Sequence, residues 1–227
     1  MDIHRDAVMK ALINEQWKRF VTAGEDERQC FLYNLLEHGK HLKEKQLQML
    51  LWEPIIETSD TTLVTTEWAM YELGKDRVRQ ELLYNEITRI CGSNKVTEDM
   101  LSQIPYLTAV FHETLRYHNP VAMVPLRYIA INPYGCYMDK KQRENPDQWL
   151  PERFLDPKFD PMDLHKTMAF GGGRRVCAGA LQASLIACTA LGRFVQLKQE
   201  EEEDVDTVGL TTLKLRPLHV ARKPRKG

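Results

Sequence analysis

The ten residues Phe170-Gly-Gly-Gly-Arg-Arg-Val-Cys-Ala-Gly179 combine several chemical requirements in one short stretch of this 227-residue sequence. The glycines at 171–173 permit backbone conformations that are closed to other residues, and they let a flat ligand approach the main chain. Cys177 comes at the mouth of a predicted helix, where the helix dipole and the unpaired N–H groups favour a thiolate. Arg175 can meet an anionic group on the same ligand.

Other readings of this stretch make different demands on its spacing. A phosphate-binding loop needs Gly-x-x-x-x-Gly-Lys-Ser/Thr, and no Lys-Ser or Lys-Thr pair follows. A dinucleotide fingerprint needs a third glycine, where Val176 stands. A nucleophilic cysteine needs a histidine partner whose place the sequence does not give. A glycine loop before a helix with an inert cysteine is the plainest alternative.

The spacing Phe-x-x-Gly-x-Arg-x-Cys-x-Gly, met at Phe170, Gly173, Arg175, Cys177 and Gly179, resembles the haem-ligand signature of the cytochrome P450 family. The resemblance implies a haem b at residues 170–179. It also implies that the Cys177 thiolate is the axial ligand of the iron.

Further elements of that family follow in its order. Glu113-Thr-Leu-Arg116 resembles the Glu-x-x-Arg helix motif, although an i,i+3 ion pair alone is common on helix surfaces. Arg153, in Pro-Glu-Arg-Phe, resembles the arginine that completes the ion network beneath the haem. Asp60-Thr61 resembles the acid–alcohol pair of the long distal helix, which implies a catalytic role in proton delivery. A polar patch inside a helix is the alternative for this pair.

Arg127 resembles the family's haem-propionate arginine, with an ordinary strand-end arginine as the alternative. The family places a β excursion soon after this point, and here the chain passes directly to Ile129. A second shortening follows Val195. Thr58 stands where the family usually carries glycine or alanine. We therefore expect an incomplete fold that corresponds to about the C-terminal half of the family's domain.

The hydrophobic patterns predict a mainly α fold with a small β component, in one partial domain over residues 1–227. Pro54 should kink the long helix, and the polar run at 58–62 invites local opening. We expect helices at 3–22, 30–37, 43–73, 75–90, 105–117 and 178–195, a strand within 121–131, ordered loop with short turns over 133–165 and a hairpin within 207–220.

Composition and charge exclude several classes of protein. The 31 Lys and Arg residues nearly balance the 32 Asp and Glu residues. The resulting net charge of -1 gives no long-range electrostatic attraction to nucleic acid. The five cysteines lack CxxC spacing, so neither a zinc site nor a disulfide framework is indicated. No apolar run of about 18 residues or signal peptide is present, so the chain as written is expected to be soluble.

The amino-acid sequence of the segments 47–73, 151–189 and 205–215 resembles that of plant members of the family that oxidise diterpene hydrocarbons. This resemblance implies a haem-thiolate monooxygenase that uses O2 and electrons from NADPH through NADPH-cytochrome P450 reductase. It implies membrane association of intact relatives, at the cytosolic face of the endoplasmic reticulum or the plastid outer envelope. The alternative is a truncated, non-catalytic remnant that binds haem weakly or not at all. A helical interaction module is a third possibility, but no heptad seam supports it.

Overall fold

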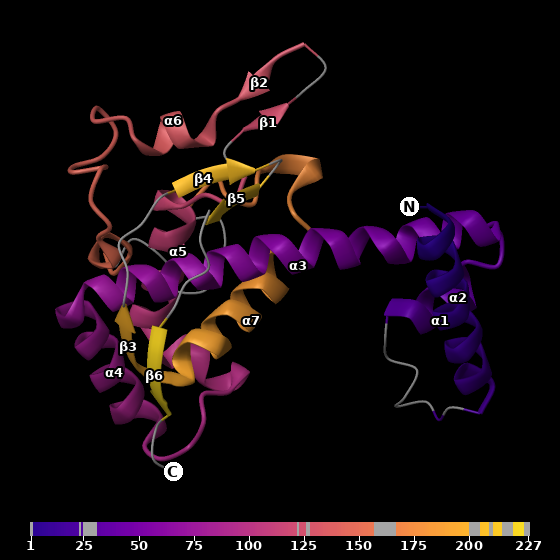
Figure 1. Ribbon diagram of the computed structural model, residues 1–227, viewed down its shortest axis with the longest axis horizontal. Helices are drawn as coiled ribbons and strands as arrows, with labels where there is room; N and C mark the ends of the chain where they lie inside the picture. Colours follow the sequence, from indigo (N-terminus) through magenta and orange to yellow (C-terminus); the bar gives the residue numbers. More distant parts are fainter. Residues whose placement is uncertain are drawn as a thin grey trace. The chain divides into compact units, whose positions relative to one another are not determined.

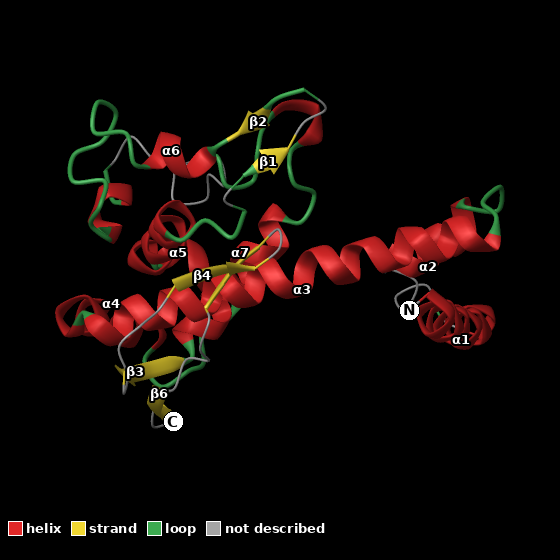
Figure 2. Cartoon of the chain, turned by 45° about the horizontal axis from the view of Figure 1, so that its top comes forward, coloured by secondary structure: helices red, strands yellow, loops and turns green. Residues whose placement is uncertain are grey.

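A computed structural model describes residues 2–22, 24, 31–121, 123–125, 128–156, 167–199, 205–208, 211–214 and 220–224. Helices dominate this part of the chain and the strands are short, as Figure 2 shows. The prediction of a mainly α fold with a small β component is confirmed. The chain divides into two compact units, residues 1–59 and 60–227. That residues 1–227 make one partial domain stays a prediction.

The first unit contains α1 (Asp2–Thr22), α2 (Phe31–His38) and the first part of α3 (Glu44–Lys75). All three helices lie within about two residues of their predicted bounds. A small apolar cluster forms its core, consisting of Ile13, Tyr33 and Leu36 with the partly buried Leu32, Leu47 and Leu51. The unit therefore buries few large side chains.

Helix α3 runs from Glu44 to Lys75 without interruption, although Pro54 lies inside it. The predicted local opening at 58–62 is therefore wrong. Threonine hydroxyls instead donate to carbonyls one turn back, from Thr58 to Pro54 and from Thr65 to Thr61, where the second distance is 2.8 Å. Such bonds satisfy the side chains without breaking the helix.

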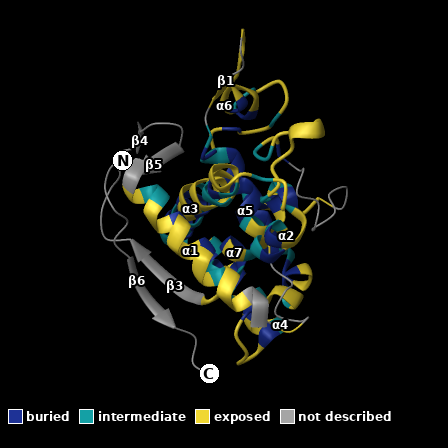
Figure 3. Ribbon diagram, turned by 90° about the vertical axis from the view of Figure 1, so that its right-hand side faces the viewer, coloured by how far each residue is buried: buried dark blue, intermediate teal, exposed yellow. Residues whose placement is uncertain are grey.

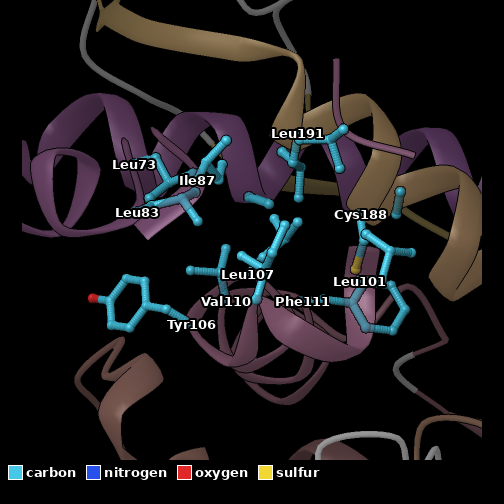
Figure 4. Packing of buried hydrophobic residues seen from close by; sticks show 14 of the residues in the cluster. Leu73, Leu83, Ile87, Leu101, Tyr106, Leu107, Val110, Phe111, Cys188 and Leu191 are labelled. Carbon is cyan, nitrogen blue, oxygen red and sulfur yellow. The ribbon is translucent and has the colours of Figure 1, made fainter. Parts of the chain in front are cut away.

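The second unit is built around α5 (Pro105–Tyr117), which is buried on every side from Tyr106 to Arg116 (Figure 3). It contacts α4 (Arg77–Cys91), α7 (Ala180–Gly192) and the 3-10 turn η2 (Glu98–Gln103) (Figure 1). Figure 4 shows the apolar core that these elements share. Its labelled members are Leu73, Leu83, Ile87, Leu101, Tyr106, Leu107, Val110, Phe111, Cys188 and Leu191.

Local signals set the ends of these helices. The Asp76 carboxylate caps α4 by accepting from the Arg79 amide at 3.0 Å. Gly92 ends α4 with a φ of 56°, a conformation that favours glycine. Pro105 begins α5, as predicted. At the end of α7, a Cβ added to Gly192 would lie 2.9 Å from a Val96 methyl, so glycine permits this close packing.

The β structure differs in part from the prediction. The stretch 121–131 forms not one strand but two, β1 (Val124–Pro125) and β2 (Ala130–Ile131), which pair antiparallel. Pro125 has no amide to extend a ladder, which accounts for the shortness of β1. A C-terminal hairpin forms as predicted, from the antiparallel pair β4 (Val205–Val208) and β5 (Thr211–Lys214), but it spans 205–214 and not the predicted 207–220.

A further correction concerns α7. The predicted helix 178–195 is too long, because the chain leaves α7 at Gly192 and enters β3 (Phe194–Gln199), which pairs antiparallel with β6 (Val220–Pro224). Over 133–156 the predicted loop with short turns is found, its turns including α6 (Pro133–Tyr137) and η3 (Pro151–Phe154), and the rest of that prediction lies outside the described residues. Among the described helices, none is long and apolar enough to cross a lipid bilayer.

The contact between α4 and α5 predicts a pH effect on stability. Glu86 accepts from the Tyr106 amide at 2.9 Å, and burial raises the pKa of this carboxyl above 4.5. Because the pKa of Glu86 is raised in the folded chain, protonation of this carboxyl stabilises the fold. This contribution is fully present below the ordinary glutamate pKa and is lost as pH rises through the folded pKa. Glu86→Gln keeps an acceptor oxygen but no charge.

We therefore expect the stability of Glu86→Gln relative to the wild type to increase as pH rises above that pKa. Urea unfolding of both chains across the pH range from about 4 to about 8 measures this difference. Glu81→Gln, on the exposed face of α4, is the control. A pH-independent difference between the Glu86 variant and the wild type would contradict the prediction.

Candidate functional site

A buried ion pair lies on α5. Glu113 and Arg116 are both 0% exposed and are three residues apart, so they share one face of the helix. The Arg116 guanidinium donates from Nε to Glu113 Oε2 and from Nη2 to Glu113 Oε1, both at 2.7 Å. This two-point geometry is the strongest arrangement that these groups make.

Arg153, from η3, joins the same carboxylate. Its Nε donates to Glu113 Oε1 at 3.1 Å. Its terminal nitrogens donate at 3.1 Å to the carbonyls of Glu144 and Asn145. The structure thus brings together Glu113, Arg116 and Arg153, the three residues proposed from the sequence as an ion network.

Main-chain groups of the segment 146–150 complete this cluster. The Leu150 amide donates to Glu113 Oε1 at 2.7 Å. Arg116 donates to the carbonyls of Pro146 at 2.8 Å and Gln148 at 2.9 Å. Sequence reasoning missed these partners, since a backbone carbonyl carries no signature in the residue type. Each charge in the cluster is hydrogen-bonded, which its burial requires.

The cluster holds more positive than negative charge. Two guanidiniums face one carboxylate, and the carbonyl dipoles of 144–148 offset the excess. The neighbouring Arg143 responds to this surplus. Burial, and then the charges of Arg116 and Arg153, lower the pKa of Arg143. The segment between α6 and η3 is held by these charged groups together with Trp149, which lies in the apolar core of the second unit.

The loop around Cys177 has a defined backbone. Gly171 and Gly173 have φ values of 71° and 68°, in the left-handed region that favours glycine. The Cys177 amide donates to the Phe170 carbonyl at 2.9 Å and closes the loop on itself. Gly179 is the N-cap of α7, so Cys177 stands just before the helix, as predicted.

The main-chain face of this loop is open. Among the residues that the structure describes, a Cβ added to any glycine of 171–173 would meet nothing within 4 Å. The Cys177 thiol and Arg175 are exposed. Apolar side chains beside them are also uncovered, with Val176 36% and Leu181 52% exposed. A thiol, a cation and apolar side chains around bare backbone fit a flat apolar ligand with an anionic edge.

The other cysteine near this loop has a different environment. Cys188, on α7, is 0% exposed and belongs to the core of the second unit. Burial raises the pKa of its thiol to about 12. A thiol of this kind stays protonated and acts as a packing group.

Comparison with protein-family models identifies the group to which these features belong. The model described as Cytochrome P450 matches residues 3–130 and 127–208. This chain belongs to the cytochrome P450 family. The family implies a haem with a thiolate ligand to iron, and the exposed Cys177 thiol beside the open glycine face fits that group.

Curated cytochromes P450 of plants are similar to this chain along nearly all of its length. "Ent-kaurene oxidase" of Salvia miltiorrhiza is 54% identical over 248 residues, covering 99% of this chain and 47% of the relative. "Ent-kaurene oxidase-like 3" of Oryza sativa is 51% identical, covering 97% and 48%. "Ent-sandaracopimaradiene 3-hydroxylase" of Oryza sativa is 47% identical, covering 99% and 48%. The chain spans about half the length of the curated relatives it matches.

A solved cytochrome P450 shows the same fold. The zebrafish enzyme, in a structure with abiraterone, superposes with a TM-score of 0.77 at 21% identity. The superposition covers 99% of this chain and 59% of the zebrafish chain. The prediction of a partial cytochrome P450 fold is confirmed.

The remaining cytochrome P450 positions stand as follows. Asp60 and Thr61 lie on α3, at the start of the second unit, with Asp60 exposed and Thr61 half-buried. Their proton-delivery role stays a prediction. Phe170 is half-buried and its ring packs against Phe111, with centroids 6.3 Å apart. Arg127 lies outside the described residues.

Proposed function

We propose that this chain is the haem-binding part of a cytochrome P450 monooxygenase, with Cys177 as the axial ligand of the iron. The observation that carries this proposal is the exposed Cys177 thiol before α7. It lies beside the glycines 171–173, whose main chain no described side chain covers. When bound, the haem supplies the oxygen chemistry, and the thiolate tunes it by donating electron density.

Several side chains would serve this group. The hydrogen bond from the Cys177 amide to the Phe170 carbonyl holds the loop in shape. Arg175 and Arg127 would pair with the propionates. The cluster of Glu113 with Arg116 and Arg153 fixes the segment 144–150. Each of these residues binds or positions and takes no part in electron transfer.

Asp60 and Thr61 would move protons. The carboxyl of Asp60 acts as a general acid and the hydroxyl of Thr61 passes the proton on toward the site. Their position on an unbroken helix keeps the two side chains at a fixed spacing. Both residues are proposed as catalytic.

The substrate we propose is a diterpene hydrocarbon, with ent-kaurene oxidised to ent-kaurenoic acid in gibberellin biosynthesis. The names of the relatives that are about half identical support this choice. Electrons would come from NADPH through NADPH-cytochrome P450 reductase. The intact protein would sit at the cytosolic face of the endoplasmic reticulum or plastid outer envelope.

A non-catalytic remnant is the second candidate. The 248-position alignment with the Salvia relative is longer than the 227 residues of this chain, so the relative holds residues within the aligned region that this chain lacks. A remnant of this kind would bind haem weakly or not at all.

A carbon monoxide difference spectrum decides between these functions. We expect the purified, haemin-reconstituted and reduced chain to show the red-shifted thiolate band, and Cys177→Ala to lose it completely. Cys136→Ala, which removes another exposed thiol, is the matched control and should keep the band. A wild-type chain without the band would overturn the haem proposal for this chain and favour the remnant.

A further inference from the structure

Two adjacent residues of η3 bind in different directions. Arg153 donates to the buried Glu113 of α5. Glu152 accepts from Arg79 of α4, whose Nε lies 3.0 Å from Oε1 and 3.1 Å from Oε2. One short turn is therefore attached on one side to the buried cluster and on the other to a separate helix.

The contact of Glu152 has further partners. The Tyr106 hydroxyl, in the first turn of α5, donates to Glu152 Oε1 at 2.8 Å. Asp76 accepts from both the amide and the guanidinium of Arg79, which orients that side chain. These four residues, Asp76, Arg79, Tyr106 and Glu152, are called the outer cluster below.

The charges in the outer cluster are coupled. Burial alone would lower the pKa of Arg79, but its hydrogen bonds and charge interactions with Glu152 and Asp76 outweigh burial and raise it. Burial, and then the hydrogen bond to Glu152, raise the pKa of Tyr106. Both shifts favour the charged guanidinium and the neutral phenol, the forms that donate to Glu152.

The shortness of η3 links the two clusters. It has four residues, and its first and last, Pro151 and Phe154, are buried. A unit of this length cannot rotate at Glu152 without also rotating at Arg153. Residues 79 and 152 are 73 positions apart, so their contact fixes η3 against a distant helix.

We propose that Glu152 is a positioning residue: through Arg79 and Tyr106 it sets the orientation of η3 and so places Arg153 against Glu113. It acts through Arg153 and touches no ligand itself. The link from the buried cluster to haem binding rests on the proposed function, whereas the coupling of Glu152 to Arg153 does not.

A double-mutant cycle on the haem-free full chain tests this coupling. Glu152→Gln should lower the ratio of folded to unfolded chain about tenfold in urea unfolding, as loss of a charge-assisted bond does. In the background of Arg153→Gln, the same change should lower the ratio about twofold or less, because η3 then carries no Arg153 to place against Glu113. Equal effects in both backgrounds would overturn the proposal.

Matched variants of α4 sharpen the test. Arg79→Gln should reproduce the loss seen in Glu152→Gln, and combining the two should cost little more than either alone. Arg77→Gln is the control, because Arg77 pairs only loosely with Glu81 of its own helix, at 3.8 Å, and is 81% exposed. A similar loss in Arg77→Gln would contradict the inference.

A spectroscopic readout separates positioning from stability. In haem-loaded chain under conditions where both proteins are folded, Glu152→Gln should lower the thiolate share of the carbon monoxide spectrum, while Arg77→Gln leaves it unchanged. An unaltered share would overturn the link to haem. If the wild type shows no thiolate band, the proposed function fails, and the urea cycle still decides whether Glu152 positions Arg153.

Discussion

Glu113→Gln is expected to lower the free energy of unfolding by about 3–5 kcal/mol, the usual cost of breaking a buried ion pair. Both partners in the pair with Arg116 are 0% exposed. The neutral amide leaves two buried or half-buried guanidiniums without their shared anion, and its NH2 group points a donor at other donors. Such a loss removes a large part of the stability of an ordinary domain.

Urea unfolding followed by circular dichroism measures this loss. Glu81→Gln, on exposed α4 surface, should change stability by less than about 0.5 kcal/mol. The double variant Glu113→Gln/Arg116→Met provides a second comparison that stays informative if Glu113→Gln fails to fold, since apolar replacement of buried ionic residues is often tolerated. The double variant should be more stable than Glu113→Gln alone. A single variant that loses under about 1 kcal/mol would show the cluster to be energetically minor.

Phe111→Ala is expected to cost about 3–5 kcal/mol through loss of buried apolar surface and formation of a cavity. Phe111 is 1% exposed and lies in the core of the second unit. It also packs against Phe170, whose carbonyl accepts from the Cys177 amide. The substitution should therefore loosen the cysteine loop as well as the core.

Chemical labelling distinguishes these two effects. The rate at which a thiol reagent modifies Cys177, read by peptide mass spectrometry at low urea, should rise in Phe111→Ala. Leu107→Ala removes a 0% exposed side chain of the same helix one turn earlier and should lose comparable stability. Its Cys177 labelling rate should stay near that of the wild type. Equal acceleration in both variants would mean that Phe111 has no special part in holding the loop.

The sequence predicted the central helix better than it predicted that helix's surroundings. Pro105 marked its start, and residues 105–117 are the helix that forms. The amino-acid pattern does not show that all residues from Tyr106 to Arg116 are buried, because polar ones such as His112 and Thr114 alternate with apolar ones. Burial on every side comes from the elements that pack around α5, and those are distant in sequence.

The candidate site was predictable to the same limited extent. The spacing of Glu113 and Arg116 alone has no value, since exposed helices carry the same pattern. Resemblance to a family supplied the third partner, Arg153. Nothing in the sequence pointed to Glu152 bridging Arg79 and Tyr106, because ion pairs between distant elements depend on tertiary packing.

The differences in the β region have local causes. A run of β-branched and apolar residues predicted one strand over 121–131, but Pro125 cannot donate to a ladder. No proline stands between Gly192 and the predicted helix end at Val195, so the change to strand at Phe194 was not marked in the sequence. Short turns such as η3 lack the length for a periodic signal.

Within 144–150 the hydrogen bonds to the charged cluster come from main-chain carbonyls and the Leu150 amide, and Trp149 packs in the apolar core, while the side chains of Glu144, Asn145 and Gln148 are exposed. Evolution can therefore replace Glu144 and Gln148 freely as long as the main chain keeps its path, whereas Asn145, with a φ of 44°, lies in the left-handed region that favours asparagine or glycine. The three charged residues that bind this segment, Glu113, Arg116 and Arg153, have no such freedom. A substitution in one of them would survive only with a compensating substitution in another. Diverging descendants of this chain would therefore keep the three charged residues and vary the exposed side chains of the segment that these residues bind.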